Sequence, residues 1–308
     1  MNFGVIDIGS NGIRVLIAQH LGVAGFKEIF SVRSPIRLGE DVFTQGSISA
    51  EKQKALVDAM VEFSQIFKQK KVDALFVGAT SALREAKNHK QLIQLVRDKS
   101  GLQIVLIDGE REARLIHKAV AHELKIKSGK NLLLDIGGGS CEFVLSEGEK
   151  YLNYVSLKAG AVRLVNDINM SKPYLSREYL ESIIQTYIDD LGDFKEFIKQ
   201  PDHGFIATGG NARSLNKLSR IIFNHSNRAF ITQNQMEMLV AIVFGFSHDD
   251  RVTKLDLRVD RVDVILPASL LILKTMQTFG FDKVLTPKIG LRHGMLLELL
   301  ANFSEQRR

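Results

Sequence analysis

The chain has 308 residues, of which 45% are hydrophobic, 25% charged and 7% aromatic, a composition typical of globular proteins and sufficient for two domains. Its single cysteine, Cys141, excludes an intrachain disulfide and a zinc site built from several cysteines. Lys and Arg number 41 and Asp and Glu 35, so the net charge is +6, a modest surplus that suits an anionic ligand without requiring one.

No segment of the sequence has the length and apolarity of a membrane anchor. The longest apolar stretches, such as Met238 to Phe246, span nine residues, short of the roughly 18 to 20 that a spanning helix needs. The chain reaches Asp7 without a basic segment or the apolar run of a secretory signal. We therefore expect a cytoplasmic protein without a membrane partner.

The first half opens on two strand-like runs joined by Asp7-Ile8-Gly9. Residues 5–18 read VIDIGSNGIRVLIA, and glycine between apolar runs is typical of a hairpin turn because it readily adopts a positive φ. Ser47 and Ser49 are candidate caps of a helix that runs to about residue 70. Further strands are expected at 74–79 and 103–108, and further helices from about 88 and over 110–124.

The second half repeats this opening. Residues 133–146 read LLDIGGGSCEFVLS, so Asp135-Ile136-Gly137 follows Asp7-Ile8-Gly9 at an offset of 128 positions, and Glu142 takes the place of Arg14. The patterns predict strands at 131–136, 141–147, 150–157, 203–208 and 282–286, and helices at 176–197, 211–220, 234–245, 262–279 and 290–304. Alternating strands and helices around a repeated hairpin indicate an α/β protein made of two copies of one domain.

Two Asp-Ile-Gly turns in register favour a phosphate and metal site. Consecutive N–H groups of a glycine turn can converge on an anion, and an aspartate at the end of the preceding strand can hold Mg²⁺. A third turn, Thr208-Gly209-Gly210, leads from a strand into a helix, whose N-terminus attracts phosphate. Neither the dinucleotide-binding spacing, nor a P-loop, nor a His-x-x-x-His zinc motif occurs in the sequence.

Seven segments, in order along the chain, resemble the exopolyphosphatase and guanosine pentaphosphate phosphohydrolase family of the actin-like ATPase, chaperone and sugar kinase superfamily. They are Asp7–Asn11, Ala79–Ala86, Gly109–Leu115, Asp135–Ser140 with Glu142, Gly160–Leu164, Thr208–Gly210 and Arg261–Pro267. The resemblance implies two ribonuclease H-like α/β domains with a cleft between them. These are expected at 1–122, completed by a C-terminal helix at 290–308, and at 123–289.

The same resemblance implies Mg²⁺-dependent hydrolysis of the terminal phosphate of inorganic polyphosphate, with guanosine pentaphosphate as the alternative substrate and no nucleic acid partner. The resemblance is also compatible with a homodimer, although the sequence itself indicates no interface. Glu112 falls on the family's catalytic glutamate; from the residues alone it would be an ordinary carboxylate in the first turn of a helix. Asp7, Asp135 and Glu142 fall on metal-binding positions. The phosphate-binding positions are Gly9, Ser10, Asn11, Arg84, Gly137, Gly138, Gly139, Ser140, Gly209 and Gly210.

Other readings stay open at this point. Arg163 and Arg261 are further candidates for contact with an anionic tail. An ATP-dependent sugar kinase or a chaperone-like ATPase module of the same superfamily would need an adenosine pocket, of which the loop after Gly210 gives no clear sign. A nucleotide-binding regulator without turnover would be distinguished by the loss of Glu112 or Asp135, and both are present.

Overall fold

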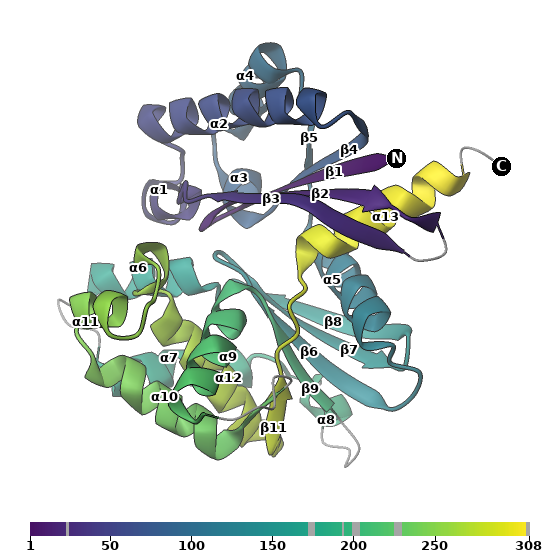
Figure 1. Cartoon of the computed structure of the whole chain (residues 1–308). Coiled ribbons are helices and arrows are strands. Elements are labelled where there is room, and N and C mark those ends of the chain that lie inside the picture. The colour runs from purple at the N-terminus through teal and green to yellow at the C-terminus, as the bar shows by residue number, and fades with distance from the viewer. Residues whose placement is uncertain (23–24, 172–175, 193, 199–203, 225–229, 306–308) are drawn as a thin grey trace. The chain divides into compact units, whose positions relative to one another are not determined.

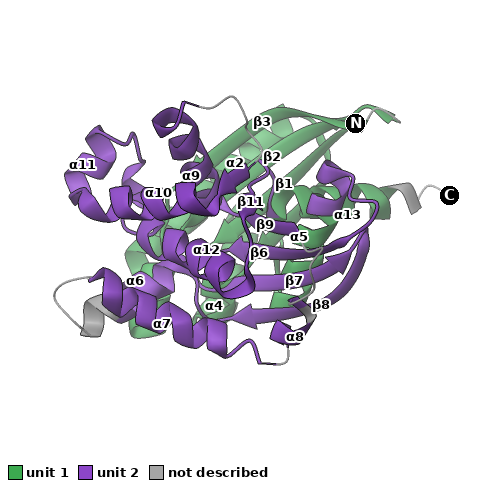
Figure 2. Ribbon diagram, turned by 90° about the horizontal axis from the view of Figure 1, so that it is seen from below, with its two compact units in different colours: residues 1–119, 291–308 green, residues 120–290 purple. Residues whose placement is uncertain are grey.

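The computed structural model describes residues 1–22, 25–171, 176–192, 194–198, 204–224 and 230–305 (Figure 1). It divides into two compact units, of which unit 1 is residues 1–119 with 291–308 and unit 2 is residues 120–290 (Figure 2). Unit 1 has 20 Lys and Arg residues against 15 Asp and Glu, and unit 2 has 21 against 20. The positive surplus of the chain therefore belongs almost entirely to unit 1.

Unit 1 is a mixed sheet with helices on both faces. The strand order is β3-β2-β1-β4-β5. Antiparallel β1 (Asn2–Gly9), β2 (Gly12–His20) and β3 (Phe26–Ser34) are followed by the parallel strands β4 (Val72–Ala79) and β5 (Ile104–Leu106). The helices are α1 (Leu38–Gln45), α2 (Ala50–Gln69), α3 (Ser81–Glu85), α4 (His89–Ser100), the start of α5 (Gly109–Leu124) and α13 (Leu291–Glu305).

The central strand β1 is buried along its length because each face has its own helical cover. Ile6 and Ile8 join one core cluster with the apolar face of α2, including Leu56 and Met60. On the other face, α13 packs on β1 and β4, and the Phe3 and Phe303 rings meet edge to face at 5.2 Å (Figure 1). Side chains alternate along a strand, so Asp7 lies on the α13 face, with Phe3.

Unit 2 carries a six-stranded mixed sheet in the order β10-β11-β9-β6-β7-β8. Its strands are β6 (Lys130–Ile136), β7 (Cys141–Glu147), β8 (Lys150–Leu157), β9 (Gly204–Thr208), β10 (Phe230–Thr232) and β11 (Lys283–Leu285). The antiparallel run β6-β7-β8 followed by the parallel β9 repeats the arrangement β1-β2-β3 with β4. The two sheets thus share a topology, in agreement with the duplicated α/β domain.

In unit 2 the helix α12 (Ile265–Phe279), whose residues are mostly buried, packs against α6, α7, α9 and α10. Between β8 and α12 lie α6 (Ala161–Ser171), α7 (Arg177–Asp189), α8 (Phe194–Ile198), α9 (Gly210–Ile222), α10 (Gln233–Gly245) and α11 (His248–Thr253), with a 3₁₀ turn, η2 (Val259–Arg261). Within the described residues, we find no helix with the length and apolarity to cross a membrane.

Most predicted elements are present, and the differences lie in short or exposed segments. Both Asp-Ile-Gly hairpins form, and the helix capped by Ser49 is confirmed as α2, because the Ser49 side chain accepts a hydrogen bond from the Lys52 N–H. The single helix at 176–197 is wrong: α7 ends at Asp189, and Gly192 adopts φ +51° before α8 begins. His203, expected in a strand, lies outside the described residues. The sequence did not predict β3, α1, α3, α6, β10 or α11.

Candidate active site

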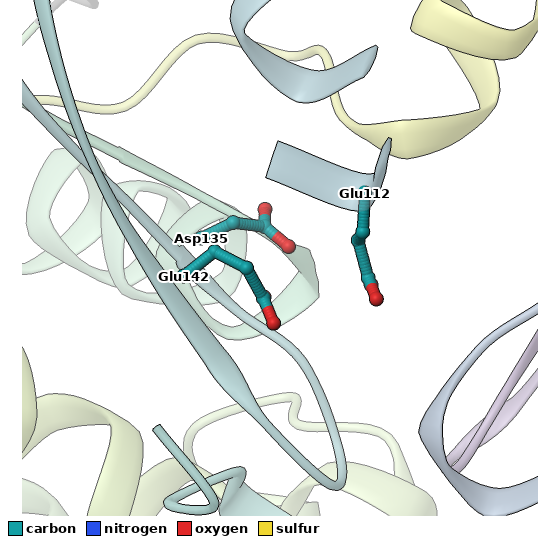
Figure 3. Close-up of side chains that lie close together, drawn as sticks. All are labelled: Glu112, Asp135 and Glu142. Carbon is teal, nitrogen blue, oxygen red and sulfur yellow. The ribbon is translucent and has the colours of Figure 1, made fainter. Parts of the chain in front are cut away.

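Two acidic side chains stand opposite each other where β6 ends and β7 begins. Asp135 and Glu142 are direct partners across the two antiparallel strands, and Figure 3 shows both side chains extending from this hairpin. Direct partners project to the same face of a sheet. A carboxylate oxygen of each lies within 4.8 Å of the other, and the residues are only 7% and 0% exposed. The hairpin therefore holds two carboxylates together in a buried position.

A row of four polar side chains runs across the sheet at this level. In register, Thr208 on β9 is the partner of Asp135, and Ser156 on β8 is the partner of Glu142. The Thr208 hydroxyl donates to Asp135 Oδ1, and the Ser156 hydroxyl donates to Glu142 Oε1 at 3.0 Å. Each carboxylate thus has a hydroxyl that orients it. Ser156 was missed in the sequence, although counting the hairpin register outward from Glu142 would have found it.

The donor set of this pair fits a hard divalent cation. Two carboxylates held this close repel one another unless a proton or a cation accompanies them. Mg²⁺ takes oxygen ligands, commonly one or two carboxylates together with waters. Asp135 and Glu142 match that requirement. Cys141, the buried neighbour of Glu142, offers no thiolate, because burial and then the charges of Glu142 and Asp135 raise the pKa of its thiol well above the usual range.

The glycine turn of unit 2 lies directly beside the acidic pair. Gly137, Gly138, Gly139 and Ser140 connect β6 to β7, and the Gly137 N–H donates to the Ser140 carbonyl at 3.1 Å. The third glycine turn follows β9 at the same edge, because β9 and β6 are parallel neighbours. Unit 2 therefore brings Asp135, Glu142 and two of the three predicted glycine turns to one sheet edge.

The third turn is shaped by close packing. Gly209 adopts φ +99°, and a side chain there would also meet the Ile136 carbonyl. Arg261 packs against Gly210, and its Nη1 donates to Asn211 Oδ1 at 2.8 Å. Arg261 is only 7% exposed. Its guanidinium is therefore part of the turn's own structure.

The first glycine turn, in unit 1, has a different charge. Asp7 and Arg14 are partners across β1 and β2, and Arg14 Nη1 lies 2.9 Å from Asp7 Oδ2. Ser10, in the turn, shares a hydrogen bond of 3.0 Å with Ser81 at the start of α3. Arg84, on α3, donates to the Ile107 carbonyl. Unit 1 therefore gathers Asp7, the turn Gly9–Asn11 and the helix that carries Arg84.

Glu112, also drawn in Figure 3, lies in the first turn of α5, within unit 1. Asp108, the residue before the helix, caps it: its carboxylate accepts the Arg111 N–H at 2.8 Å, and its carbonyl accepts the Glu112 N–H at 2.9 Å. A carboxylate in this turn is stabilised by the helix dipole. The position of Glu112 in a charged first turn would by itself indicate an exposed carboxylate. In the structure Glu112 is only 5% exposed.

Comparison with known proteins assigns this arrangement to a family. The sequence profile of the Ppx/GppA phosphatase family matches residues 16–303. The chain belongs to the Ppx/GppA phosphatase family. The resemblance seen in the seven motifs is thereby confirmed, and the Ppx/GppA relatives are hydrolases of phosphoanhydride bonds.

Curated relatives of this Ppx/GppA chain carry two names. Exopolyphosphatase 1 of Mycobacterium tuberculosis (strain ATCC 25618 / H37Rv) is 27% identical over 307 residues, which cover 97% of this chain and 88% of the relative. The guanosine-5'-triphosphate,3'-diphosphate pyrophosphatase of Vibrio vulnificus (strain YJ016) is 24% identical over 307 residues, which cover 98% of this chain and 60% of the relative. These identities do not separate the two substrates.

Solved structures agree with the family assignment. The Ppx/GppA family member of Aquifex aeolicus superimposes with a TM-score of 0.80 at 25% identity, covering 98% of both chains. An exopolyphosphatase from Cytophaga hutchinsonii ATCC 33406 superimposes with a TM-score of 0.89 at 22% identity, again over 98% of both chains. The second likeness establishes the fold.

Proposed function

We propose that this Ppx/GppA chain is an exopolyphosphatase, which hydrolyses the terminal phosphate of inorganic polyphosphate and requires Mg²⁺. The observation that carries the proposal is the buried pair Asp135 and Glu142 beside the glycine turn Gly137–Ser140, since a terminal phosphate needs both a cation and N–H donors. The mycobacterial exopolyphosphatase, similar over nearly the whole chain, supports the choice of substrate.

In this proposal Asp135 and Glu142 would hold Mg²⁺, with Asp7 as a third carboxylate of the metal site. When bound, the ion neutralises charge on the phosphate oxygens. Thr208 and Ser156 keep one oxygen of each acidic residue in a hydrogen bond, which orients the carboxylates. Asp7 uses Oδ2 for Arg14, so its Oδ1 is the atom left for an interaction through water.

The phosphate itself would be bound by the three glycine turns and by Arg84. The proposed donors are the N–H groups of Gly9, Ser10 and Asn11, of Gly138, Gly139 and Ser140, and of Gly209 and Gly210, because backbone N–H groups in such turns bind phosphate oxygens without adding a mobile side chain. Gly137 would contribute by closing the turn, since its own N–H donates to the Ser140 carbonyl. Arg84 would add a planar, permanently charged donor.

Glu112 is the proposed general base. Its carboxylate would accept a proton from a water molecule whose oxygen attacks the terminal phosphorus in line with the bond that breaks. The bridging oxygen then leaves with the shortened polyphosphate chain, and the former terminal phosphate departs as orthophosphate. A carboxylate suits this role because it accepts a proton at neutral pH without changing its position in the first turn of α5.

Guanosine pentaphosphate is the second candidate substrate. The Vibrio relatives, named guanosine-5'-triphosphate,3'-diphosphate pyrophosphatases, match 97–98% of this chain. The bond broken, a phosphoanhydride at the end of a phosphate chain, is of the same type, and the same residues would serve. We also propose a cytoplasmic homodimer that needs neither nucleic acid nor a membrane, and light scattering on purified protein tests the dimer.

A substrate panel tests the function. Purified protein is incubated with long-chain polyphosphate, tripolyphosphate, guanosine pentaphosphate and ATP, each with Mg²⁺ and with EDTA, and released phosphate is measured. We expect Mg²⁺-dependent release from polyphosphate, and a higher kcat/KM for guanosine pentaphosphate would support the second candidate. Turnover of ATP alone would refute both and favour an ATPase or kinase of the same fold.

A further inference from the structure

The start of helix α6 is bonded to the glycine turn of unit 2. The N–H groups of Ala161 and Val162 donate to the carbonyls of Gly137 and Gly138 at 3.0 and 2.9 Å, and the Arg163 N–H also donates to the Gly138 carbonyl at 3.0 Å. These are among the N–H groups that have no partner inside their own helix. The first N–H groups of α6 therefore donate to the carbonyl oxygens of the glycine turn.

The side chain of Arg163 completes this contact. Its Nε donates to the Gly139 carbonyl at 2.8 Å, so three successive turn carbonyls, Gly137 to Gly139, all point toward α6. The approach is close: a Cβ on Gly160 would lie 2.4 Å from backbone atoms of Gly138 and Gly139. Glycine is required at 160 because no side chain fits there.

This arrangement determines where the turn's N–H groups point. In a trans peptide the N–H is directed opposite to the carbonyl of the same peptide unit. The peptide units whose carbonyls belong to Gly137, Gly138 and Gly139 carry the N–H groups of Gly138, Gly139 and Ser140. With the carbonyls held toward α6, these three N–H groups face away from the helix. That is the arrangement of an anion-binding nest.

The first glycine turn, in unit 1, is held in the same way. The Gly39 N–H, in the first turn of α1, donates to the Ser10 carbonyl at 2.9 Å, and Arg33 Nη2 donates to the Asn11 carbonyl at 2.6 Å. Ser10 and Asn11 precede Gly138 and Gly139 by the same offset of 128 positions that relates the two hairpins. In each unit a helix N–H and an arginine side chain thus hold equivalent carbonyls.

We propose that Arg163 and Arg33 are positioning residues for phosphate binding, one for each hairpin turn, and that they act through the turn carbonyls without contacting the substrate. The inference rests on the proposed function for the nature of the ligand, a phosphate chain. It assigns to Arg163 a role different from direct contact with an anionic tail. A guanidinium suits this role because it stays charged and donates along a fixed direction.

The first experiment needs no substrate. Hydrogen exchange of the Ala161 and Val162 amides is compared in wild type and Arg163→Gln, and exchange of the Gly39 amide in wild type and Arg33→Gln. We expect exchange in each variant to be about tenfold faster, the effect of losing one charge-assisted hydrogen bond. Arg177→Gln in α7 and Arg97→Gln in α4, which remove arginines on other helices, are expected to leave the exchange of these amides unchanged.

The second experiment separates positioning from direct contact. Binding of tripolyphosphate is measured by calorimetry at several salt concentrations. If these arginines are positioning residues, Arg163→Gln and Arg33→Gln should each weaken tripolyphosphate binding about tenfold. The slope of log affinity against log salt concentration should stay unchanged, since the charge that is removed does not contact the ligand. A direct phosphate ligand would reduce that slope by about one when removed, as in binding of nucleic acid backbones.

Faster amide exchange together with weaker binding at an unchanged slope supports the proposal. Unchanged exchange, a slope reduced by about one, or unchanged affinity in Arg163→Gln overturns it. Failure of the proposed function is seen separately: wild-type protein that neither binds tripolyphosphate nor releases phosphate from the substrate panel refutes that function, while the exchange measurement still reports on the turn. Circular dichroism and thermal melts confirm that each variant is folded.

Discussion

Asp7 and Arg14 face each other across β1 and β2 and form an ion pair, with Arg14 Nη1 2.9 Å from Asp7 Oδ2. The same two positions of the second hairpin hold Asp135 and Glu142. One copy of the repeat thus carries a neutral pair and the other a doubly acidic pair. This difference in charge is the reason why the proposed cation site is centred on Asp135 and Glu142 of unit 2, whereas the carboxylate of Asp7 is already neutralised by Arg14.

The acidic pair predicts how Mg²⁺ dependence responds to mutation. Glu142→Gln removes one of two negative charges and an oxygen ligand, so the Mg²⁺ concentration for half-maximal phosphate release should rise about 10- to 100-fold. Glu147→Gln, on the exposed far end of β7, is the matched control. Calorimetric titration with Mg²⁺ alone should show the same loss. Equal Mg²⁺ affinity in both variants would refute the assignment of Glu142 as a ligand of the ion.

The ion pair of unit 1 predicts a stability effect. Asp7→Asn leaves the guanidinium of Arg14, whose side chain is 23% exposed, without its buried carboxylate. We expect the free energy of unfolding in urea to fall by about 1–3 kcal/mol. Asp58→Asn breaks the exposed pair with Lys54 on α2 and should change it by less than about 0.5 kcal/mol. Equal effects of the two variants would show that burial of Asp7 does not matter.

The proposed base predicts a separation of binding from turnover. Glu112→Gln keeps the size and most hydrogen-bonding capacity of the side chain but cannot accept the proton, so kcat should fall by about 10² to 10⁴ while tripolyphosphate binding persists. Glu110→Gln, two residues earlier in the same helical turn and paired with Arg114, is the control. Normal hydrolysis by Glu112→Gln would refute the assignment.

Burial of His117 predicts a loss of stability in acid. Burial lowers the pKa of this histidine on α5 from its usual 6.5. Below about pH 6.5 the histidine of the unfolded chain binds a proton more readily than that of the folded chain. The contribution of neutral His117 to the free energy of unfolding is therefore fully present above pH 6.5 and declines as the pH falls. The decline can reach about 1.4 kcal/mol per pH unit. Urea unfolding at pH 7.5 and 5.5 should show a smaller difference for His117→Gln than for wild type; equal differences would contradict this.

Local signals account for the parts of the fold that were predicted. The Asp-Ile-Gly turns between apolar runs and the Ser49 cap are decided within a few residues, so the hairpins and α2 could be found without tertiary contacts. The edge strand β3 lacks a clear pattern because much of it is exposed. Its counterpart β8 was predicted, and the internal repeat would have located β3.

The candidate site also has a part that the sequence predicts and a part that it does not. The residues of the acidic pair and the three glycine turns are readable in the sequence because each belongs to one turn or hairpin. The contacts that hold them cannot be predicted in this way: Thr208 reaches Asp135 from a strand 73 positions away, and Arg33 reaches Asn11 from 22 positions away. Such contacts depend on strand order and on where a helix begins, which no local pattern encodes.

The sequence by itself therefore determined the α/β class, the duplication, and the family with its phosphoanhydride chemistry, since motifs of a few residues carry all three. Tertiary structure decided that the side chains of Asp7 and Arg14 form an ion pair, that Thr208 donates to Asp135, and that Arg163 holds the glycine turn. Charge, burial and direction of a hydrogen bond are properties of neighbours in space, and the fold supplies those neighbours.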